Sequence, residues 1–594
     1  MNVGRVGLPL STRTASAPST RTPSPLSTRT SEAPRARTAA VNNHSIATPS
    51  NVRRALFAAA FGGALLTAAC ASNVSGVGAG ATSSRHGWTI PGHLRIGMSD
   101  EPDNLNPMFA HSDATDQIDA LIFAPVFRYD QHGEFVPELA TEVPTYANGG
   151  ISKDSRTIVL HWRHGVRWAD GAPLTARDLR FTWRAAIDKR NTTKALYGWD
   201  DVERIDVPDD YTAVVRLKRP NANVLGIFGG GGGSAYPPLP EHLLGKLPDL
   251  NRADFNAHPL SSGPFVLKTW NHGSGFEFEP NPAYWRGAPK LQRLSIKIVP
   301  DPDSLFSELA THDIDVIANV DERLVPRLHQ IAGLHEVTHL IANWRRLAIN
   351  CSRPGLSDAR VRLAIAEGID WNRLNATVYH GYNLRSTSDI PPDSWAAPHV
   401  PFYPYDPAGA KRLLDAAGWT PGPDGVRRKA GAPLGLTISA THKPGNEEAE
   451  VQMQQQLRGL GLALTIKNYP ASFLFAQTGP LYSGTYDLEW SIDTNGPDPD
   501  NQGSWSGDFV PPKGANTSFL RDPEITALSD AALRTFDRAK RKALYQREET
   551  RIHELVPTVF FYWERTLAAY NADLRNYEPA EYITDNWNSW EWQI

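Results

Sequence analysis

The stretch TYDLEWSIDTNGPDPD, residues 485–500, decides the fold because it joins a strand to a loop that cannot extend it. Its first half alternates apolar with polar residues, as in a half-buried strand, and the apolar ones are Tyr486, Leu488, Trp490 and Ile492. The second half contains Gly-Pro and a further Pro, which cannot donate to a ladder. Asp493 is therefore expected just after a strand, at the sheet edge where open α/β sheets bind ligands.

The residues before this stretch predict a parallel sheet. Strands are expected at 434–440 and 462–469, a helix at 446–458 between them, and a helix from Ser472 before the strand 486–492. Strand–helix–strand order is typical of parallel sheets with right-handed crossovers, in which all carboxyl ends share one edge. Lys443, just after one strand, should therefore open onto the same edge as Asp493.

Capping residues mark other helix ends. Thr175 is expected to cap a helix over 175–187. Asp406 followed by Pro407 is expected to start another helix, which Gly418 ends. These positions fix element boundaries that apolar periodicity alone leaves vague.

Length and composition bound the class of protein. A chain of 594 residues is too long for one hydrophobic core, so about three domains are expected. A hydrophobic content of 41% with 17 Trp indicates a folded chain. Cys70 and Cys351 are its two cysteines and supply no zinc framework; if Cys70 is modified, Cys351 is a lone thiol without a disulfide.

Residues 1–51 differ from the rest of the chain. The tetrapeptide STRT recurs at positions 11, 19 and 27 among Ser, Pro, Ala and Arg, with no apolar period. Such a segment cannot offset the entropy of ordering, so we expect either disorder or a start annotated too far upstream, with Val52 as the true start. A basic binding arm is the alternative.

Residues 52–69 are predicted to be a lipoprotein signal peptide. Arg53 and Arg54 precede 15 apolar and small residues that end in Leu-Thr-Ala-Ala before Cys70. The run is short and broken by Gly for a membrane span. It resembles a bacterial lipoprotein signal, although Thr67 stands where that pattern prefers Leu, and this resemblance implies lipid attachment at Cys70. An ordinary secretory signal with an incidental Cys is the alternative. Residues 70–87, rich in Gly, Ser and Ala, are expected to be a flexible tether.

The charge of the mature chain argues against a nucleic-acid partner. Residues 1–69 hold eight Arg and one Glu, so their removal leaves 52 basic and 63 acidic residues, a net charge of −11. Nucleic-acid binding would need a basic footprint.

Several blocks of the chain occur in the order found in one known family. They are LRIGMSDEPDNLNP (94–107), FVPELAT (135–141), HWRHGVRWADGAPLTARDLRFTW (161–183), SSGPFVLKTW (261–270), NPAYWRGAP (281–289), DIDV (313–316), LSDARVRLAIAEGID (356–370) and YDPAGAKRLLDAAGW (405–419). With the stretch 485–500, they resemble the extracytoplasmic solute-binding proteins of peptide and nickel ABC importers, solute-binding protein family 5. The resemblance covers roughly residues 88–594.

The resemblance implies a mixed α/β, two-lobed periplasmic-binding-protein fold with a ligand cleft between the lobes. Lobe one is expected at 88–299 plus 562–594, with an inserted subdomain at roughly 128–225, and lobe two at 300–561. The chain is expected to cross between lobes near Val299–Asp301 and again near Trp563.

The same resemblance implies a site for a zwitterionic peptide. In the family, the Asp of a W-x-x-D loop pairs with the ligand's amino group, and Trp490–Asp493 matches that motif. A basic residue before Pro-x-Asn receives the carboxylate; here Lys443 replaces Arg and loses the bidentate fork. Trp490 and Trp505 are candidate cleft-lining residues. The alternatives are a loop-capping carboxylate for Asp493, a solvated lysine for Lys443 and core packing for both tryptophans.

The sequence HEVTH, 335–339, matches the zinc-hydrolase motif HExxH. On a helix its two His would lie one turn apart, but on a strand residues four apart are separated by about 13 Å. The surroundings alternate like a strand after Gly333, so we expect a structural role and no bound metal.

Together these observations predict a monomeric, lipid-anchored binding protein outside the cytoplasm, without catalytic residues or cofactor. It is expected to capture a di- or oligopeptide and to deliver it to the permease and ATPase subunits of an ABC importer. The alternatives are a nickel complex or an oligosaccharide as solute and, from another class, a zinc hydrolase that uses HEVTH.

Overall fold

A computed structural model describes residues 85–110, 112–193, 195–229, 235–580 and 584–594. The described residues all belong to one compact unit, 82–594. The predicted N-terminal extension, the signal peptide and Cys70 lie outside the described residues. Within the described part, no helix is both long and apolar enough to cross a membrane.

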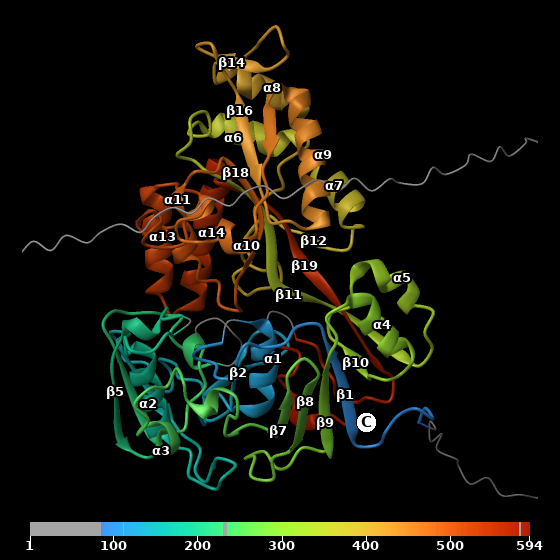
Figure 1. The fold of residues 1–594 in the computed structure, drawn as a ribbon. Coiled ribbons are helices and arrows are strands. Elements are labelled where there is room, and N and C mark those ends of the chain that lie inside the picture. The colour runs from blue at the N-terminus through green and yellow to red at the C-terminus, as the bar shows by residue number, and fades with distance from the viewer. Residues whose placement is uncertain (1–84, 111, 194, 230–234, 581–583) are drawn as a thin grey trace, which may run out of the picture. The chain divides into compact units, whose positions relative to one another are not determined.

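One mixed sheet runs through the unit and contains 11 strands (Figure 1). In spatial order they are β17 (Ala463–Ile466), β16 (Gly435–Ser439), β18 (Leu488–Thr494), β11 (Leu334–Ile349), β19 (Thr558–Asn571), β10 (Val316–Ile317), β1 (His93–Met98), β9 (Arg293–Ile298), β8 (Gly275–Pro280) and β7 (Phe265–Asn271), with β12 (Leu384–Arg385) beside β19.

Three small sheets accompany the large one. They are β4 (Thr157–His161), β6 (Thr212–Leu217) and β5 (Val202–Asp209); β2 (Phe127–Tyr129) with β3 (Phe135–Pro137); and β13 (Thr420–Pro421), β14 (Arg427–Lys429) and β15 (Ala432–Pro433). The first of these lies within the expected inserted subdomain, so we propose that this sheet and helix α2 are its core.

Fourteen α-helices occur among the described residues. They are α1 (Asp113–Ile122), α2 (Ala176–Ile187), α3 (Glu241–Leu244), α4 (Pro302–Ala310), α5 (Val325–Leu328), α6 (Ala359–Gly368), α7 (Trp371–Val378), α8 (Pro407–Ala416), α9 (Pro444–Leu460), α10 (Ala471–Leu474), α11 (Pro480–Ser483), α12 (Gln502–Trp505), α13 (Pro523–Leu533) and α14 (Arg538–Leu555). Thr175 and Asp406 cap α2 and α8 as predicted, and Gly418 follows α8 with a φ of 84°.

Strands β11 and β19 connect the two lobes. β19 pairs with β10 through Tyr570 and with the far end of β11 through Val559. The two largest buried clusters lie on either side, one around β1, β8 and β9 and the other around β16, β18 and α9. A lobe that lost either long strand would lose part of its own sheet.

We propose that the first passage between lobes lies later than residues 299–301. Val316 of β10 pairs with both β1 and β19, and α4 packs beside β1 and β10. We therefore propose that residues 300–333 belong with lobe one and that the boundary falls within β11. The second passage stays a prediction; Trp563, near which we expect it, lies within β19.

The parallel sheet predicted for lobe two is confirmed, because β16 pairs in parallel with both β17 and β18. Two details differ. β18 extends past Ile492 to Thr494, because antiparallel pairing with β11 places Asp493 opposite Trp344. The expected helix from Ser472 is two short helices, α10 and α11. Gly479 lies between them, where an added Cβ would lie 1.9 Å from the carbonyl oxygen of Phe473.

The motif HEVTH lies on β11, as the alternation predicts. His335 is exposed, whereas His339 is buried and contacts Asp585 at 3.2 Å. Glu336 contacts His329 at 3.0 Å. Among the described residues, no three His, Cys, Asp or Glu side chains are grouped to hold a metal ion.

We predict that the purified protein binds no stoichiometric zinc, because a strand separates the two His too far for one ion. Elemental analysis and a peptidase assay, on wild type and on Glu336→Gln, provide the check. Equimolar zinc together with an activity that Glu336→Gln abolishes would contradict the structural role of this motif.

Candidate ligand-binding site

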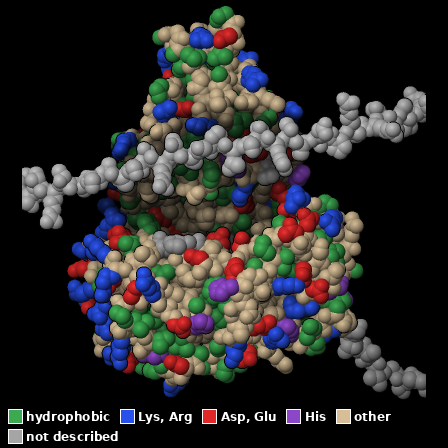
Figure 2. Space-filling view, viewed as in Figure 1, with side chains coloured by type: hydrophobic (Ala, Val, Ile, Leu, Met, Phe, Trp, Pro, Cys, Tyr) green, Lys and Arg blue, Asp and Glu red, His purple; other side chains and the backbone are tan. Residues whose placement is uncertain are grey.

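A cavity of about 380 Å³ lies where the carboxyl ends of β1 and β10 meet the middle of β11. Its walls are residues 96–100, 113–117 except Thr115, Leu305, 316–319, 341–343, Thr494, Thr566, Tyr577 and 584–586. Figure 2 shows the surface hollowed between the part that carries β18 and the part that carries β1, with acidic side chains along the lower rim. Both lobes therefore contribute to one cavity.

The break in β11 forms one wall of the cavity. The pairing of β11 with β19 shifts register between Leu340 and Trp344, so residues 341–343 leave the regular ladder. The end of β18 and the residue after it hold this segment: the Thr494 hydroxyl donates to the Asn343 side chain at 3.0 Å, and the Asn495 backbone N–H donates to the Ala342 carbonyl oxygen at 3.0 Å. Residues 341–343 therefore lie at the cavity without regular backbone pairing to β19.

The cavity carries negative charge. Its walls include Asp100, Asp113, Asp116 and Asp585, and none of the described residues that line it is Lys, Arg or His. The amino end of α1 stabilises the charges of Asp113 and Asp116 in its first turn. A concave surface of one sign concentrates ions of the other sign, so this cavity favours a cationic group.

Asp493 does not itself line this cavity; it precedes Thr494, which does, and both belong to the end of β18. Its carboxylate is part-exposed, at 38%, and forms an ion pair with the Arg346 guanidinium from the neighbouring strand β11. Burial opposes the charge of Arg346, but Asp493 and Glu489 raise its pKa above the ordinary arginine value. One side of the Asp493 carboxylate is thus fixed by Arg346 while the rest faces outward.

Glu489 lies behind this pair and is fully buried. Burial raises its pKa to about 7, although Arg346 and a 2.7 Å hydrogen bond from the Ser491 hydroxyl act the other way. Arg346 therefore has two carboxyl neighbours, and Asp493 is the more exposed of them. This arrangement holds the Asp493 side chain in position without neutralising it fully.

Two carboxylates of the loop after β18 attach it to both lobes. Asp498 accepts two 2.6 Å hydrogen bonds from Arg541 of α14. Asp500 accepts from Tyr197 and, at 3.2 Å, from the Asn223 side chain, both residues of the opposite lobe. The segment DTNGPDPD is therefore a bridge between the lobes, and one of its residues, Thr494, lines the cavity.

Buried carboxyl groups support this bridge from within lobe two. Asp389 accepts a 2.8 Å hydrogen bond from the Trp505 indole, and Asn495 donates to the Asp389 backbone oxygen at 2.7 Å. Burial, and then Asp389, raise the pKa of Glu549 well above its usual value. Glu548 accepts from Ser529 at 2.6 Å, and burial raises its pKa to about 8.

The two candidate tryptophans are buried, at 1% for Trp490 and 2% for Trp505. Trp490 packs against Trp371 and Phe561 and contacts the Arg345 guanidinium; Trp505 packs against Phe560. This placement matches the core alternative stated for both. Lys443 is exposed at the N-cap of α9 and does not line the cavity.

Sequence reasoning missed several residues that the structure brings to the site. Arg346, Asn343, Asp498 and Asp500 gain their roles from partners 43 to 303 positions away, which no local pattern reveals. A weak signal existed for Arg346, since two consecutive Arg inside an apolar strand imply at least one buried partner.

Two lobes joined by shared strands around a polar cavity define a two-lobed solute-binding protein. A family profile described as "Bacterial extracellular solute-binding proteins, family 5 Middle" matches residues 134–513, more than half of the chain, so the chain belongs to that family. The family consists of substrate-binding proteins of ABC importers, which lie outside the cytoplasm and are not enzymes.

Individual relatives agree with this assignment. The oligopeptide-binding protein AppA of Bacillus subtilis is 26% identical over 503 residues, which cover 82% of this chain and 89% of that protein. Its structure with a nonapeptide gives a TM-score of 0.70 at 24% identity, covering 84% of this chain and 98% of that one. NikZ of Campylobacter jejuni, solved with Ni(L-His), gives 0.71 at 24% identity, covering 85% and 100%.

The buried Glu548 predicts a pH-dependent stability. Its folded pKa, about 8, lies above its ordinary value of 4.5, so the folded state binds the proton more tightly. The free energy of unfolding should therefore fall as the pH rises from about 4.5 to about 8. Glu548→Gln keeps an acceptor for Ser529 and should reduce this fall by on the order of 1–3 kcal/mol between pH 5 and pH 8, measured by urea denaturation.

The matched control is Glu554→Gln on the same helix, whose side chain is 59% exposed beside Arg551. This variant should keep the wild-type pH dependence. An unchanged pH dependence in Glu548→Gln would show that this carboxyl group is not protonated in the folded protein.

Proposed function

We propose that this protein captures a peptide in the cavity between its lobes, with the ligand's ammonium group toward Asp493 and the acidic walls. The observation that carries the proposal is the sign of the cavity: four aspartates and no basic side chain line it among the described residues. A free peptide amino terminus is a cation small enough to enter such a site. The peptide complexes of AppA and of DppA from Helicobacter pylori support a peptide as ligand.

Asp493 suits the role of ammonium anchor because its geometry is fixed in advance. Arg346 holds one side of the carboxylate, so little side-chain entropy is lost when a ligand ammonium meets the exposed side. The charge-assisted hydrogen bond gained is worth roughly 1.5–3 kcal/mol. Ligand binding then adds to an existing ion pair and does not need to break it.

Lys443 is proposed to receive the ligand's carboxylate. It is exposed and stands at the N-cap of the 17-residue helix α9, whose positive end also favours an anion. Trp490 supports the site indirectly, because its ring packs on Arg345, which donates to Tyr562 at 2.8 Å. Trp505 fixes Asp389 and, through it, the bridging loop.

The ligand is captured when the two lobes close around it. Contacts such as Asp500 with Tyr197 and Asn223 join the lobes and can form only when the lobes are close. A ligand that touches both lobes shifts the population toward this state. Closure also removes water, which strengthens the ammonium–carboxylate contact.

A nickel complex is the second candidate ligand, because the acidic walls also attract a metal cation complex and NikZ was solved with Ni(L-His). Calorimetry with a tripeptide and with Ni(L-His) separates the two.

Asp493→Asn keeps the side-chain shape and removes its charge. Affinity for a free peptide should fall by roughly ten- to a hundredfold, since each 1.4 kcal/mol is tenfold. Acetylation of the peptide's amino group should lower its affinity for the wild type by about the same factor. It should lower the affinity for Asp493→Asn little, and calorimetry can measure both effects. Equal affinity of wild type for free and acetylated peptides would refute the anchor.

The control for this experiment is Asp487→Asn. Asp487 precedes the same strand and pairs with Arg353 at 2.7 Å. Its loss should affect stability while the ratio of affinities for free and acetylated peptide stays at the wild-type value.

We further propose that residues 52–69 are a signal peptide, that Cys70 carries lipid, and that the anchored monomer delivers its ligand to a permease and ATPase. The n-region, apolar run and small residues before Cys70 support the anchoring step.

If Cys70 is the lipid attachment site, intact-mass analysis of the native protein should find a lipidated chain that begins at Cys70. Cys70→Ser should leave the membrane fraction, whereas Cys351→Ser should remain there. A Cys70→Ser protein that stays membrane-bound would exclude anchoring through this residue.

A further inference from the structure

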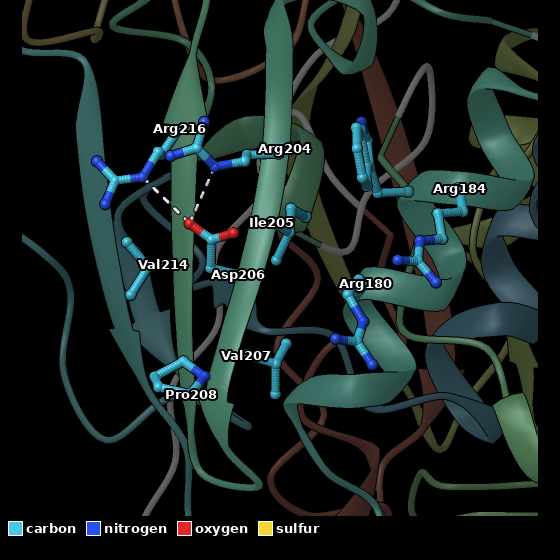
Figure 3. A pocket seen from close by; sticks show the side chains of 10 residues that line it. Arg180, Arg184, Arg204, Ile205, Asp206, Val207, Pro208, Val214 and Arg216 are labelled. Atoms are coloured by element: carbon cyan, nitrogen blue, oxygen red, sulfur yellow. Dashed lines mark hydrogen bonds and ion pairs between the residues drawn. The ribbon is translucent and has the colours of Figure 1, made fainter.

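A second concave site lies on the subdomain, far in sequence from the ligand cavity. It is an open groove of about 710 Å³ between helix α2 and strand β5 (Figure 3). Five consecutive residues, 204–208, line it from β5. Because successive side chains of a strand point to opposite faces, five in a row mean that the groove follows the edge of the strand.

β5 is the outer strand of its sheet, whose order is β4-β6-β5. The outer edge of such a strand presents backbone N–H and C=O groups that can pair with a further extended chain. Arg204 pairs across the sheet with Arg216 of β6, so the inner edge is already used. The groove thus contains a free strand edge.

Guanidinium groups flank this edge on both sides. Figure 3 shows Arg180 and Arg184 on α2 at one side and Arg204 and Arg216 at the other, with Asp206 between the latter pair. Asp206 contacts Arg204 and Arg216 at 3.1 Å each. Four arginines against one aspartate leave the walls with an excess of positive charge, in a mature chain whose net charge is −11.

The α2 side carries donors without a partner. Arg180 Nε and Trp183 Nε1 are buried and, among the described residues, donate to no hydrogen-bond acceptor; Trp183 is 9% exposed. Arg180 and Arg184 are also like charges one turn apart, which costs helix stability. A buried donor without an acceptor is costly, so an anion in the groove would satisfy these donors and also reduce the repulsion between Arg180 and Arg184.

We propose that this groove binds an extended acidic segment of a partner protein, which adds as a strand along the outer edge of β5. The spacing fits: residues four apart on α2 are about 6 Å apart along the helix, and alternate residues of a strand are about 6.6 Å apart. Alternate Glu or Asp side chains can therefore meet Arg180 and Arg184 in turn, each as a charge-assisted pair.

The charge of the groove and its position on the molecule favour an acidic segment over three other occupants. A second copy of the groove would bring arginines against arginines. The chain's own residues 1–69 hold eight Arg and one Glu, so they have the wrong sign. A membrane surface is less suitable as the occupant. The proposed lipid anchor precedes the described residues, and these begin on the side of lobe one opposite to β5 (Figure 1).

The test uses a fluorescein-labelled heptapeptide of alternating Glu and Val, with acetylated and amidated ends, titrated into the full-length protein. Blocked ends keep the probe from the ammonium site, and Asp493→Asn should bind it as wild type does, so this result does not depend on the proposed peptide capture. Binding should weaken with salt, and Arg180→Glu with Arg184→Glu should weaken it at least about tenfold.

Arg177→Glu is the matched control, since Arg177 lies on the same helix, pairs with Asp210 and does not line the groove. It should change affinity by less than about twofold, as expected for an exposed pair. Methylation of alternate backbone nitrogens of the probe should weaken binding at least about tenfold, because it removes strand pairing.

Three outcomes would overturn the proposal: no binding of the probe, binding that the double variant leaves unchanged, or full binding of the N-methylated probe. Cosedimentation with phosphatidylglycerol vesicles that needs Arg180 and Arg184, without binding of the probe, would assign the groove to a membrane surface instead.

Discussion

The antiparallel pairing of β11 with β19 is the contact on which the rest of the structure depends. These strands complete the sheet of each lobe, since β19 reaches β10 at one end while β11 reaches β18 at the other. Their pairing is interrupted between Leu340 and Trp344, and the residues between them form a wall of the cavity. The same strands therefore join the lobes and form one wall of the cavity.

Charge placement gives the cavity its negative sign. Arg346 is buried between strands, and its two carboxyl neighbours differ in exposure: Glu489 is fully buried, and Asp493 is open on one side. Removing one partner from a buried charge is costly, so this cluster keeps Asp493 in a defined orientation. Acidic walls nearby extend the same negative field across both lobes. Recognition by charge suits the proposed capture of peptides with varied side chains.

Local sequence signals predicted local structure well. The alternation in residues 485–492 predicted β18, and Asp406, Pro407 and Gly418 predicted the limits of α8. The alternation around HEVTH placed that motif on a strand against its zinc-binding interpretation. The resemblance of ordered sequence blocks predicted the two-lobed fold, which the family assignment confirms.

What the sequence did not predict depends on partners distant along the chain. Asp493 lies inside β18, not beyond it, because Trp344 of β11 pairs with it. The helix expected from Ser472 is broken because Gly479 packs against the backbone of Phe473. The burial of Trp490 and Trp505 follows from aromatic neighbours such as Phe560 and Phe561, whose proximity no spacing reveals.

The central claim is that the cavity between the lobes holds a peptide by its positive end. Mass spectrometry of the gently purified native protein, first intact under nondenaturing conditions and then after release of the ligand, tests it most directly. The account predicts retained peptides that share a free amino terminus and vary in side chains. Retained sugar, a nickel complex or peptides with blocked amino termini would contradict it.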